Sequence, residues 1–366
     1  MKLSLSTSVL LSHLQTVTRL ASTRSAVQAL SGVMLSAHGD SLELLATDLE
    51  VGVSVSAAAD VSAEGRAVLP GRLLLDVVRA LPEGQVSIEL RAAEGDVELR
   101  SGSATFHLRT LRTEDFPPLP EPAADGKVKL PVGAFVATVA TVVRSASRDE
   151  TRPVLTGVLV SAVGAELLMV ATDSYRLSVK RTRLEAEIAS SFEANVPARA
   201  LQELARIAGE DGELTLSLRD GQVVFELPGA LLCSRLIDGQ FPNHRQLLPE
   251  NVEHELRLST AEMASVVRRV SLLAQKNAPL RLSFAEGELT VSAETPDVGE
   301  ARESLPVPFH GESFEIGFNP EFLRDGLESV ESDELVLKLI NPVRPGLLES
   351  PDSADFIYLI MPIRLT

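Results

Sequence analysis

The sequence predicts an α+β protein built from three tandem repeats of one domain, in which two helices pack on antiparallel sheets. The first observation is a long internal repeat, because Leu45-Ala46-Thr47-Asp48-Leu49 recurs 125 residues later as Val170-Ala171-Thr172-Asp173-Ser174. The second is that Phe116-Pro117 recurs at the same spacing as Phe241-Pro242. A period of this length exceeds those of solenoids and propellers, so each copy is expected to be a domain.

The third copy is the most diverged. Leu30-Ser31-Gly32-Val33 recurs as Leu155-Thr156-Gly157-Val158, and another step of 125 residues reaches Leu280-Arg281-Leu282-Ser283. A chain of 366 residues is long enough for three domains that each hold a core. We expect these domains at residues 1–122, 123–248 and 249–366.

Each copy contains two segments with helical periodicity. The first helices are expected near residues 7–20, 132–147 and 260–275, where apolar residues recur at helical spacing and predict one buried face. The second helix follows a proline in every copy, and proline is favoured in a first helical turn. These helices are expected at 71–81, 198–208 and 321–330.

The remaining segments read as strands. Apolar and polar residues alternate in 85–90, 105–109 and 213–218, and turn sequences such as Asp220-Gly221 join the runs into antiparallel hairpins. A stiff, proline-rich connector at 116–123 marks the first junction between copies, and a connector at 241–251 marks the second.

Bulk composition excludes several classes of protein. A single cysteine, Cys233, excludes an internal disulfide and fits a reducing cytoplasm, and its leucine-rich flanks predict a buried strand thiol. No apolar run approaches the roughly 18 residues of a membrane span. Residues 1–8 match the start of the later copies, so we expect them to be part of the fold and not a signal peptide.

The net charge of −17 argues against nucleic-acid binding unless basic residues are concentrated on one surface. Arg72 and Arg79 lie nearly two helical turns apart, so they share a face of the helix at 71–81. Arg199 and Arg206 occupy the corresponding places in the second copy. Further basic positions that correspond or lie close by are Arg19, Arg144 and Arg148.

Two interpretations of these arginines remain open. They can belong to solvated helix faces, or they can form one basic surface that faces a polyanion. Recurrence at the same repeat position favours the second interpretation. No aromatic residue interleaves with them, so the sequence favours sequence-independent contact with a duplex backbone over stacking on single-stranded bases.

The sequence shows no catalytic constellation, and we expect no metal and no cofactor. The six histidines lack metal-ligand spacing, and there is no phosphate-binding glycine loop or nucleophile elbow. Asp48 and Asp173 both follow Ala-Thr at a strand end, where an aspartate is expected to hydrogen-bond its own turn. The hairpin at 170–179 should lift Tyr175 and Arg176 to a strand edge, where they suit peptide or anion recognition.

Four motifs together resemble the family of bacterial replicative sliding clamps, the β subunits of DNA polymerase III. They are Glu150-Thr151-Arg152-Pro153-Val154-Leu155-Thr156-Gly157, Ala171-Thr172-Asp173-Ser174-Tyr175-Arg176-Leu177, Ile237-Asp238-Gly239-Gln240-Phe241-Pro242 and Met361-Pro362-Ile363-Arg364-Leu365. The resemblance covers the whole chain. It implies clamp-type domains in an arc that closes into a ring as a head-to-tail homodimer, with helices lining a hole for double-stranded DNA.

The resemblance also implies a function and a set of sites. The ring would be a processivity factor without an active site of its own. It would tether the DNA polymerase III α subunit, the clamp loader, other polymerases and repair proteins through short peptide motifs that carry a leucine and an aromatic residue. The implied peptide-binding residues are Leu155, Thr172, Tyr175, Arg176, Leu177, Pro242, Leu247, Met361, Pro362, Ile363 and Arg364.

Two further sets complete the expected sites. The residues expected to face DNA are Arg19, Arg24, Arg72, Arg79, Arg144, Arg148, Arg152, Arg199 and Arg206. The residues expected at the dimer interface are Phe106, Leu108, Leu272 and Leu273. Two alternatives stay open, a peptide-binding adaptor that never encircles DNA, and, more remotely, an enzyme with a site between repeats.

Overall fold

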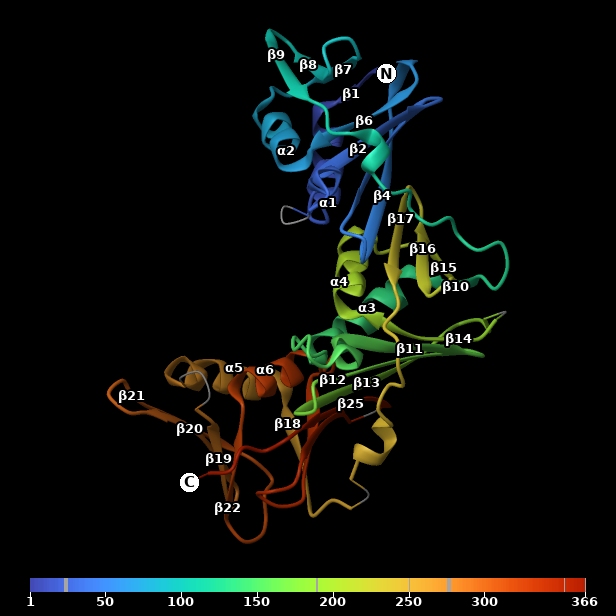
Figure 1. The fold of residues 1–366 in the computed structure, drawn as a ribbon. Coiled ribbons are helices and arrows are strands. Elements are labelled where there is room, and N and C mark those ends of the chain that lie inside the picture. Colours follow the sequence, from blue (N-terminus) through green and yellow to red (C-terminus); the bar gives the residue numbers. More distant parts are fainter. Residues whose placement is uncertain (23–25, 189, 250, 275–277, 352, 366) are drawn as a thin grey trace. The chain divides into compact units, whose positions relative to one another are not determined.

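The computed structural model describes residues 1–22, 26–188, 190–249, 251–274, 278–351 and 353–365 (Figure 1). The chain divides into two compact units. One unit comprises Met1–Gly133 with Arg206–Leu236, and the other comprises Ala134–Ala205 with Ile237–Thr366. The six α-helices of the described residues are α1 (Thr7–Val17), α2 (Gly71–Ala80), α3 (Val132–Val142), α4 (Ala198–Ile207), α5 (Thr260–Val270) and α6 (Pro320–Glu328).

All six helices lie within the ranges that the sequence predicts, apart from Pro320, which opens α6 one residue early. The expected helix at 132–147 ends at Val142, because the chain tightens there into the 3₁₀ turn η3 (Val143–Ser145). The third repeat ends its first helix in the same way, with η6 (Ser271–Leu273) after α5.

The first unit contains two antiparallel sheets. A five-stranded sheet has the order β5 (Asp60–Ala63), β1 (Lys2–Ser6), β7 (Gln85–Arg91), β8 (Asp96–Ser101) and β9 (Ala104–Arg109). An eight-stranded sheet has the order β10 (Val128–Pro131), β15 (Glu213–Arg219), β16 (Gln222–Leu227), β17 (Ala230–Arg235), β4 (Val51–Ala58), β3 (Ser41–Thr47), β2 (Gly32–His38) and β6 (Gly65–Pro70).

The second unit also contains two sheets, and its smaller sheet has four strands instead of five. Its eight-stranded sheet has the order β14 (Phe192–Pro197), β11 (Gly157–Val163), β12 (Glu166–Thr172), β13 (Arg176–Arg183), β25 (Ser353–Ile360), β24 (Gly346–Ser350), β23 (Glu334–Leu339) and β18 (His254–Ser259). Its four-stranded sheet has the order β21 (Gly299–Pro306), β20 (Glu288–Thr295), β19 (Leu280–Ala285) and β22 (Phe314–Phe318).

Each eight-stranded sheet combines strands from two successive repeats. In the first unit β4 of the first repeat pairs with β17 of the second, with Gly52 opposite Cys233. In the second unit β13 pairs with β25, with Leu177 opposite Leu359. The sheets therefore continue across residues 122/123 and 248/249, and the domain limits expected from the sequence stay a prediction.

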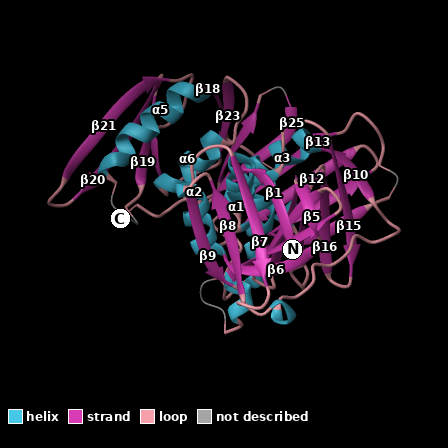
Figure 2. Ribbon diagram, turned by 90° about the horizontal axis from the view of Figure 1, so that it is seen from above, coloured by secondary structure: helices cyan, strands magenta, loops and turns pink. Residues whose placement is uncertain are grey.

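The helices bury one face against the sheets, as the periodicity predicts. Leu10, Leu14 and Val17 of α1 are fully buried, and so is Val267 of α5. Figure 2 shows α5 running alongside β19, β20 and β21. Burial of each such side chain contributes about 1.5–3 kcal/mol, which fixes the helices on the sheets and leaves their polar faces exposed.

Candidate functional site

The turn between β12 and β13 is built by its own side chains. The hydroxyl of Thr172 donates to the carbonyl of Arg176 at 2.7 Å, and the amide of Ser174 donates to that hydroxyl at 3.1 Å. Oδ1 of Asp173 accepts from the amides of Tyr175 and Arg176 at 2.9 and 3.0 Å. Ser174 has a φ of 79°, in the left-handed region. The structure confirms that Asp173 is a turn residue.

This turn brings Tyr175 to the C-terminal segment of the chain. The carbonyl of Tyr175 accepts from the amide of Met361 at 2.8 Å, directly beyond the β13–β25 ladder in which Arg176 lies opposite Ile360. Tyr175 is 61% exposed and Met361 is 39% exposed. Two neighbouring residues at the ends of adjacent strands thus expose an aromatic ring and a flexible thioether, which are side chains suited to an apolar ligand.

We expected the turn to raise Arg176 to an exposed edge as well, and this expectation is wrong. The Arg176 side chain is only 4% exposed. Its Nε donates to Oδ2 of Asp173 at 3.0 Å, its Nη1 donates to Oδ2 of Asp325 at 2.6 Å, and its Nη2 donates to a main-chain carbonyl. The guanidinium also lies 4.2 Å from the ring centroid of Phe322.

The surroundings of Arg176 keep it charged. Burial acts to lower the pKa of Arg176, but the charges and hydrogen bonds of Tyr358, Asp325 and Asp173 outweigh burial and raise it. All three nitrogens are thus used inside the protein. Arg176 holds the turn in place, and the polar groups of a ligand have no free guanidinium to meet there.

Two of the three leucines expected in the site, Leu155 and Leu177, are buried. Leu177 is buried in an apolar cluster with Val170, Val179, Leu347 and Leu359. Phe241 and Leu248 of the second connector pack against this cluster. Thr172 is also buried.

Between Phe241 and Leu248, the connector forms the turn η5 (His244–Leu247). Pro242 and Leu247 remain exposed there, with Leu247 exposed by 48%. The structure therefore brings Tyr175, Met361 and the exposed connector residues to the border of one apolar cluster.

The last residues of the expected set lie on the four-stranded sheet. The amide of Ile363 donates to the carbonyl of Gly317 on β22 at 2.7 Å, and a Cβ at Gly317 would come within 2.7 Å of the Leu365 side chain. Ile363 and Arg364 line a cavity of about 630 Å³ with Arg281 and Arg302. Pro362, between Met361 and Ile363 in the chain, is half-buried.

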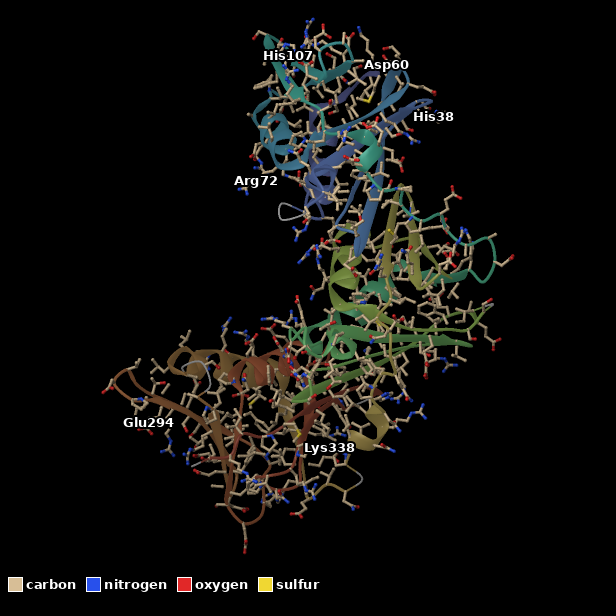
Figure 3. All side chains as sticks on the ribbon, in the orientation of Figure 1. His38, Asp60, Arg72, His107, Glu294 and Lys338 are labelled. Atoms are coloured by element: carbon tan, nitrogen blue, oxygen red, sulfur yellow. The ribbon has the colours of Figure 1, made fainter. Side chains whose placement is uncertain are left out.

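The expected DNA-facing residues of the first unit are exposed. Arg72 and Arg79 lie on α2 opposite the buried Leu74 and Val78, and Figure 3 shows Arg72 extending outward from this helix. Arg206 at the end of α4 is exposed, and so is Arg19, which lies two residues beyond the end of α1. Arg24 lies outside the described residues.

In the second unit, several expected DNA-facing arginines are paired with carboxylates. Arg144 in η3 forms an ion pair with Glu328 of α6, and Nη2 of Arg148 lies 3.8 Å from Oε1 of Glu321 on the same helix. Arg152 pairs with Asp149 and donates to the hydroxyl of Ser174 at 3.0 Å. Carboxylates of α6 thus pair with two of the arginines that we expected to face DNA, while Arg199 on α4 is exposed.

The expected interface residues lie next to two sheet edges. Phe106 and Leu108 belong to β9, an edge strand of the five-stranded sheet, and Phe106 is only partly buried. Leu272 in η6 is 81% exposed, and Leu273 is half-buried. Residues of η6 contact β20 and β21, and β21 is an edge strand of the four-stranded sheet.

The described residues hold no group of three or more histidine, cysteine, aspartate or glutamate side chains that could bind a metal ion. Among the same residues, none of the helices combines the length and the apolar character that a membrane crossing requires.

Comparison with known proteins covers the whole chain. Residues 1–120 match the N-terminal domain of the DNA polymerase III beta subunit, residues 129–243 its central domain, and residues 245–364 its C-terminal domain. The beta sliding clamp of Streptomyces coelicolor is 35% identical over 350 residues, with 92% of both chains covered. That of Synechocystis is 34% identical over 390 residues, with both chains fully covered.

Solved structures agree with these matches. The sliding clamp of Bacillus subtilis superposes with a TM-score of 0.93 at 27% identity, and both chains are fully covered. A sliding clamp of Pseudomonas aeruginosa bound to griselimycin gives 0.92 at 26% identity, again with full coverage of both chains. The chain belongs to the family of DNA polymerase III β subunits, the bacterial β sliding clamps.

Proposed function

We propose that this chain is a DNA sliding clamp that works in the bacterial cytoplasm. Two copies, each with domains at 1–122, 123–248 and 249–366, form a ring that encircles duplex DNA and tethers the replicative polymerase and other DNA-processing proteins. The ring is an accessory factor and carries no active site. The main support is the match of all three repeats, in order, to the three domains of the β subunit.

Two edge strands support a head-to-tail dimer. β9 and β21 each present a row of main-chain groups that no strand of the same sheet covers. A contact between β9 of one copy and β21 of the other is heterologous, and such contacts give closed rings when the rotation closes. Leu272 beside β21 and Phe106 on β9 supply apolar surface that this contact would bury.

The charge distribution supports sliding on DNA. The recurrent arginines of α2 and α4 are exposed, whereas the chain as a whole carries a net charge of −17. Contacts with phosphates from a few arginines are weak and independent of sequence. A closed ring needs no stronger contacts, because it is held on DNA by topology.

The surface around Tyr175 and Met361 supports peptide docking. It offers exposed apolar groups, including Leu247, over a buried leucine cluster. Methionine and exposed aromatic side chains adapt to several partners, as a shared docking site requires.

The mass of the protein in solution and its retention on circular DNA test whether it forms a ring. We expect the protein to sediment at twice its chain mass of 39.2 kDa and, after loading, to stay on nicked circular DNA but to leave it when the DNA is linearised. Leu272→Asp should give monomers, whereas Val163→Asp, a matched change at an exposed valine of β11, should not. A monomeric wild type that is retained equally on linear and circular DNA would overturn the proposal.

A peptide-binding adaptor that does not encircle DNA is the second candidate. The observation that favours it is the pairing of Arg144 and Arg148 with carboxylates of α6. It predicts that the combined changes of Arg72, Arg79, Arg199 and Arg206 to Glu leave polymerase stimulation on primed circular DNA intact. The sliding clamp predicts a strong loss.

A further inference from the structure

The turn between β3 and β4 repeats the turn of the peptide site atom for atom. Thr47 donates through its hydroxyl to the carbonyl of Val51 at 3.0 Å, and the amide of Leu49 donates to that hydroxyl at 3.0 Å. Oδ1 of Asp48 accepts from the amides of Glu50 and Val51 at 3.1 and 2.9 Å. Leu49 has a φ of 77°, close to the 79° of Ser174, although the left-handed region is sterically unfavourable for a leucine.

The strands and the connector around this turn correspond as well. β4 pairs with β17 of the next repeat as β13 pairs with β25. Phe116 of the first connector shares a buried cluster with Met34. Phe241 of the second connector packs against the same cluster as Leu159, which lies 125 residues after Met34. The junction of the first two repeats is therefore a second copy of the framework that forms the peptide site.

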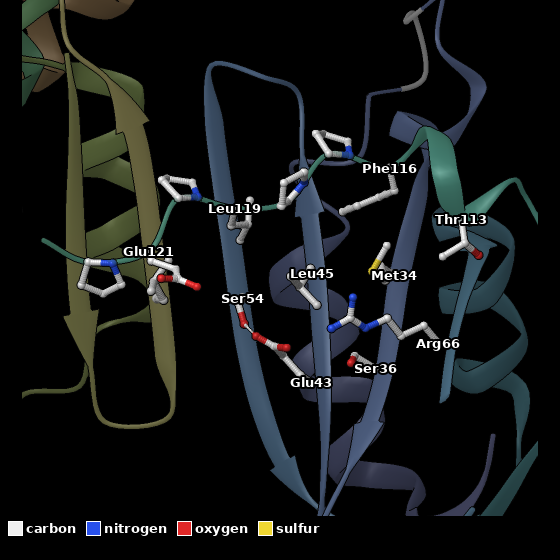
Figure 4. Close-up of a pocket in the computed structure, with 15 residues that line it drawn as sticks. Met34, Ser36, Glu43, Leu45, Ser54, Arg66, Thr113, Phe116, Leu119 and Glu121 are labelled. Atoms are coloured by element: carbon white, nitrogen blue, oxygen red, sulfur yellow. Dashed lines mark hydrogen bonds between the residues drawn. The ribbon is translucent and has the colours of Figure 1, made fainter. Parts of the chain in front are cut away.

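Two cavities flank the connector at this junction, and residues 117–120 line both. One has a volume of about 190 Å³ and is lined by Thr47, Leu49, Gly52 and Cys233. The other has a volume of about 460 Å³, and Figure 4 shows Phe116 and Leu119 of the connector above its strands. All lining residues belong to the first unit.

The decisive difference between the two junctions is Gly52, which takes the place of Leu177. A Cβ at Gly52 would come within 2.5 Å of Cδ2 of Leu119 and within 2.8 Å of Sγ of Cys233. The φ of Gly52 does not lie in the left-handed region, so the glycine provides space and not conformational freedom. Because Gly52 carries no side chain, the side chain of Leu119 packs directly against the main chain of β4 beside Cys233.

We infer that the junction of the first two repeats is a second peptide groove that the chain fills with its own connector. Leu119 takes the position of the leucine of a docked peptide, and the flanking prolines hold it there because their fixed φ angles reduce the entropy that docking would cost. This inference rests on the proposed peptide docking at the other junction. It leaves one open groove and one closed groove in each chain.

The single cysteine reports directly on the state of the closed groove. Cys233 is 6% exposed beside Leu119 and Gly52, and burial raises the pKa of its thiol to about 11, so modification by a maleimide should be slow. Leu119→Ala removes the filling side chain, and Gly52→Ala displaces it sterically. Both should accelerate labelling at least tenfold, and Leu119→Ala should do so with an unchanged melting temperature.

The matched control is Leu247→Ala in the second connector, which should leave the labelling rate of Cys233 unchanged. If Leu119→Ala lowers the melting temperature, Gly52→Ala carries the test. Unchanged labelling in both variants would show that Leu119 does not close a groove, and would overturn the inference.

Protection by an added peptide tests whether the opened space binds leucine. The probe is a synthetic nonapeptide with the sequence of residues 114–122, added to the Leu119→Ala protein. It should slow labelling of Cys233 at least tenfold, and the same peptide with alanine in place of leucine should not. If the peptide does not slow the labelling of Cys233, the contact of Leu119 with Gly52 is ordinary core packing, and the inference of a second peptide groove is overturned.

Failure of the proposed function would look different. Calorimetry of the wild-type protein with a polymerase-type peptide that carries a leucine and a phenylalanine measures the open groove alone. If that peptide does not bind while labelling and protection behave as expected, peptide docking at the second junction fails and the closed groove stands.

Discussion

Nη1 of Arg176 lies 2.6 Å from Oδ2 of Asp325, and this pair joins β13 to α6 inside the second unit. The two side chains are 4% and 13% exposed. Asp173 completes the network from the turn that carries Tyr175. Removal of the guanidinium from this network is costly, because the two carboxylates would stay buried without the cation that neutralises them.

We predict that Arg176→Ala destabilises the second unit by about 3–5 kcal/mol, since it strands Asp173 and Asp325 away from water. Urea unfolding followed by tyrosine fluorescence and circular dichroism measures the effect. Arg219→Ala, at a surface arginine that pairs with Asp220, should change the stability by less than about 0.5 kcal/mol. Equal stability of the Arg176→Ala protein and wild type would contradict the buried network.

Met361→Ala should weaken binding of a polymerase-type peptide about tenfold without a change in unfolding free energy. Met361 is exposed, so its truncation removes contact surface for a ligand and leaves no internal cavity. Isothermal calorimetry gives the affinity, and Val163→Ala provides an exposed apolar truncation outside the site. A similar loss in both proteins would remove Met361 from the docking surface.

Arg72→Ala should reduce the salt dependence of duplex binding. Each phosphate contact that is lost should lower the slope of log affinity against log salt by roughly 0.9. Fluorescence anisotropy at a series of salt concentrations measures that slope. Arg219→Ala serves as the control, and an unchanged slope in the Arg72→Ala protein would mean that α2 does not face DNA.

Stability should fall at alkaline pH through Cys233. Burial raises the pKa of its thiol from 9.0 to about 11, so the folded state favours the neutral form. The contribution is complete below pH 9 and is lost as the pH rises towards 11, with a limit of about 2–3 kcal/mol. Cys233→Ala should show a flatter decline of unfolding free energy between pH 8.5 and 10.5.

Burial also raises the pKa of Tyr358, but this residue is present in both proteins, so its effect cancels in the comparison. Parallel curves for wild type and Cys233→Ala would show that the thiol does not titrate across that range.

Local rules made the helices and the Asp173 turn predictable from the sequence. A proline before each second helix and an Ala-Thr-Asp strand end act within a few residues, and the structure confirms both. The burial of Arg176 was not predictable, because its partner Asp325 is 149 residues away along the chain. The position of Arg176 after a polar turn suggested exposure, and only the packing of α6 reverses it.

The pairing of strands from different repeats could not be predicted from the sequence for a related reason. Alternation identifies β4 and β13 as strands, but nothing in their residues names β17 or β25 as neighbours. One signal for the closed groove was present all along. Gly52 stands where the second repeat has Leu177, and a glycine within a strand often marks the close approach of another group.

The position of β25 has a consequence for how the protein is made. This strand, Ser353–Ile360, lies between β13 and β24 in the interior of its sheet. The ribosome therefore has to translate as far as Ile360 before β13 can acquire its second neighbour. Until then the nascent second unit exposes an unpaired ladder, and this interval is when chaperones would have the most to protect.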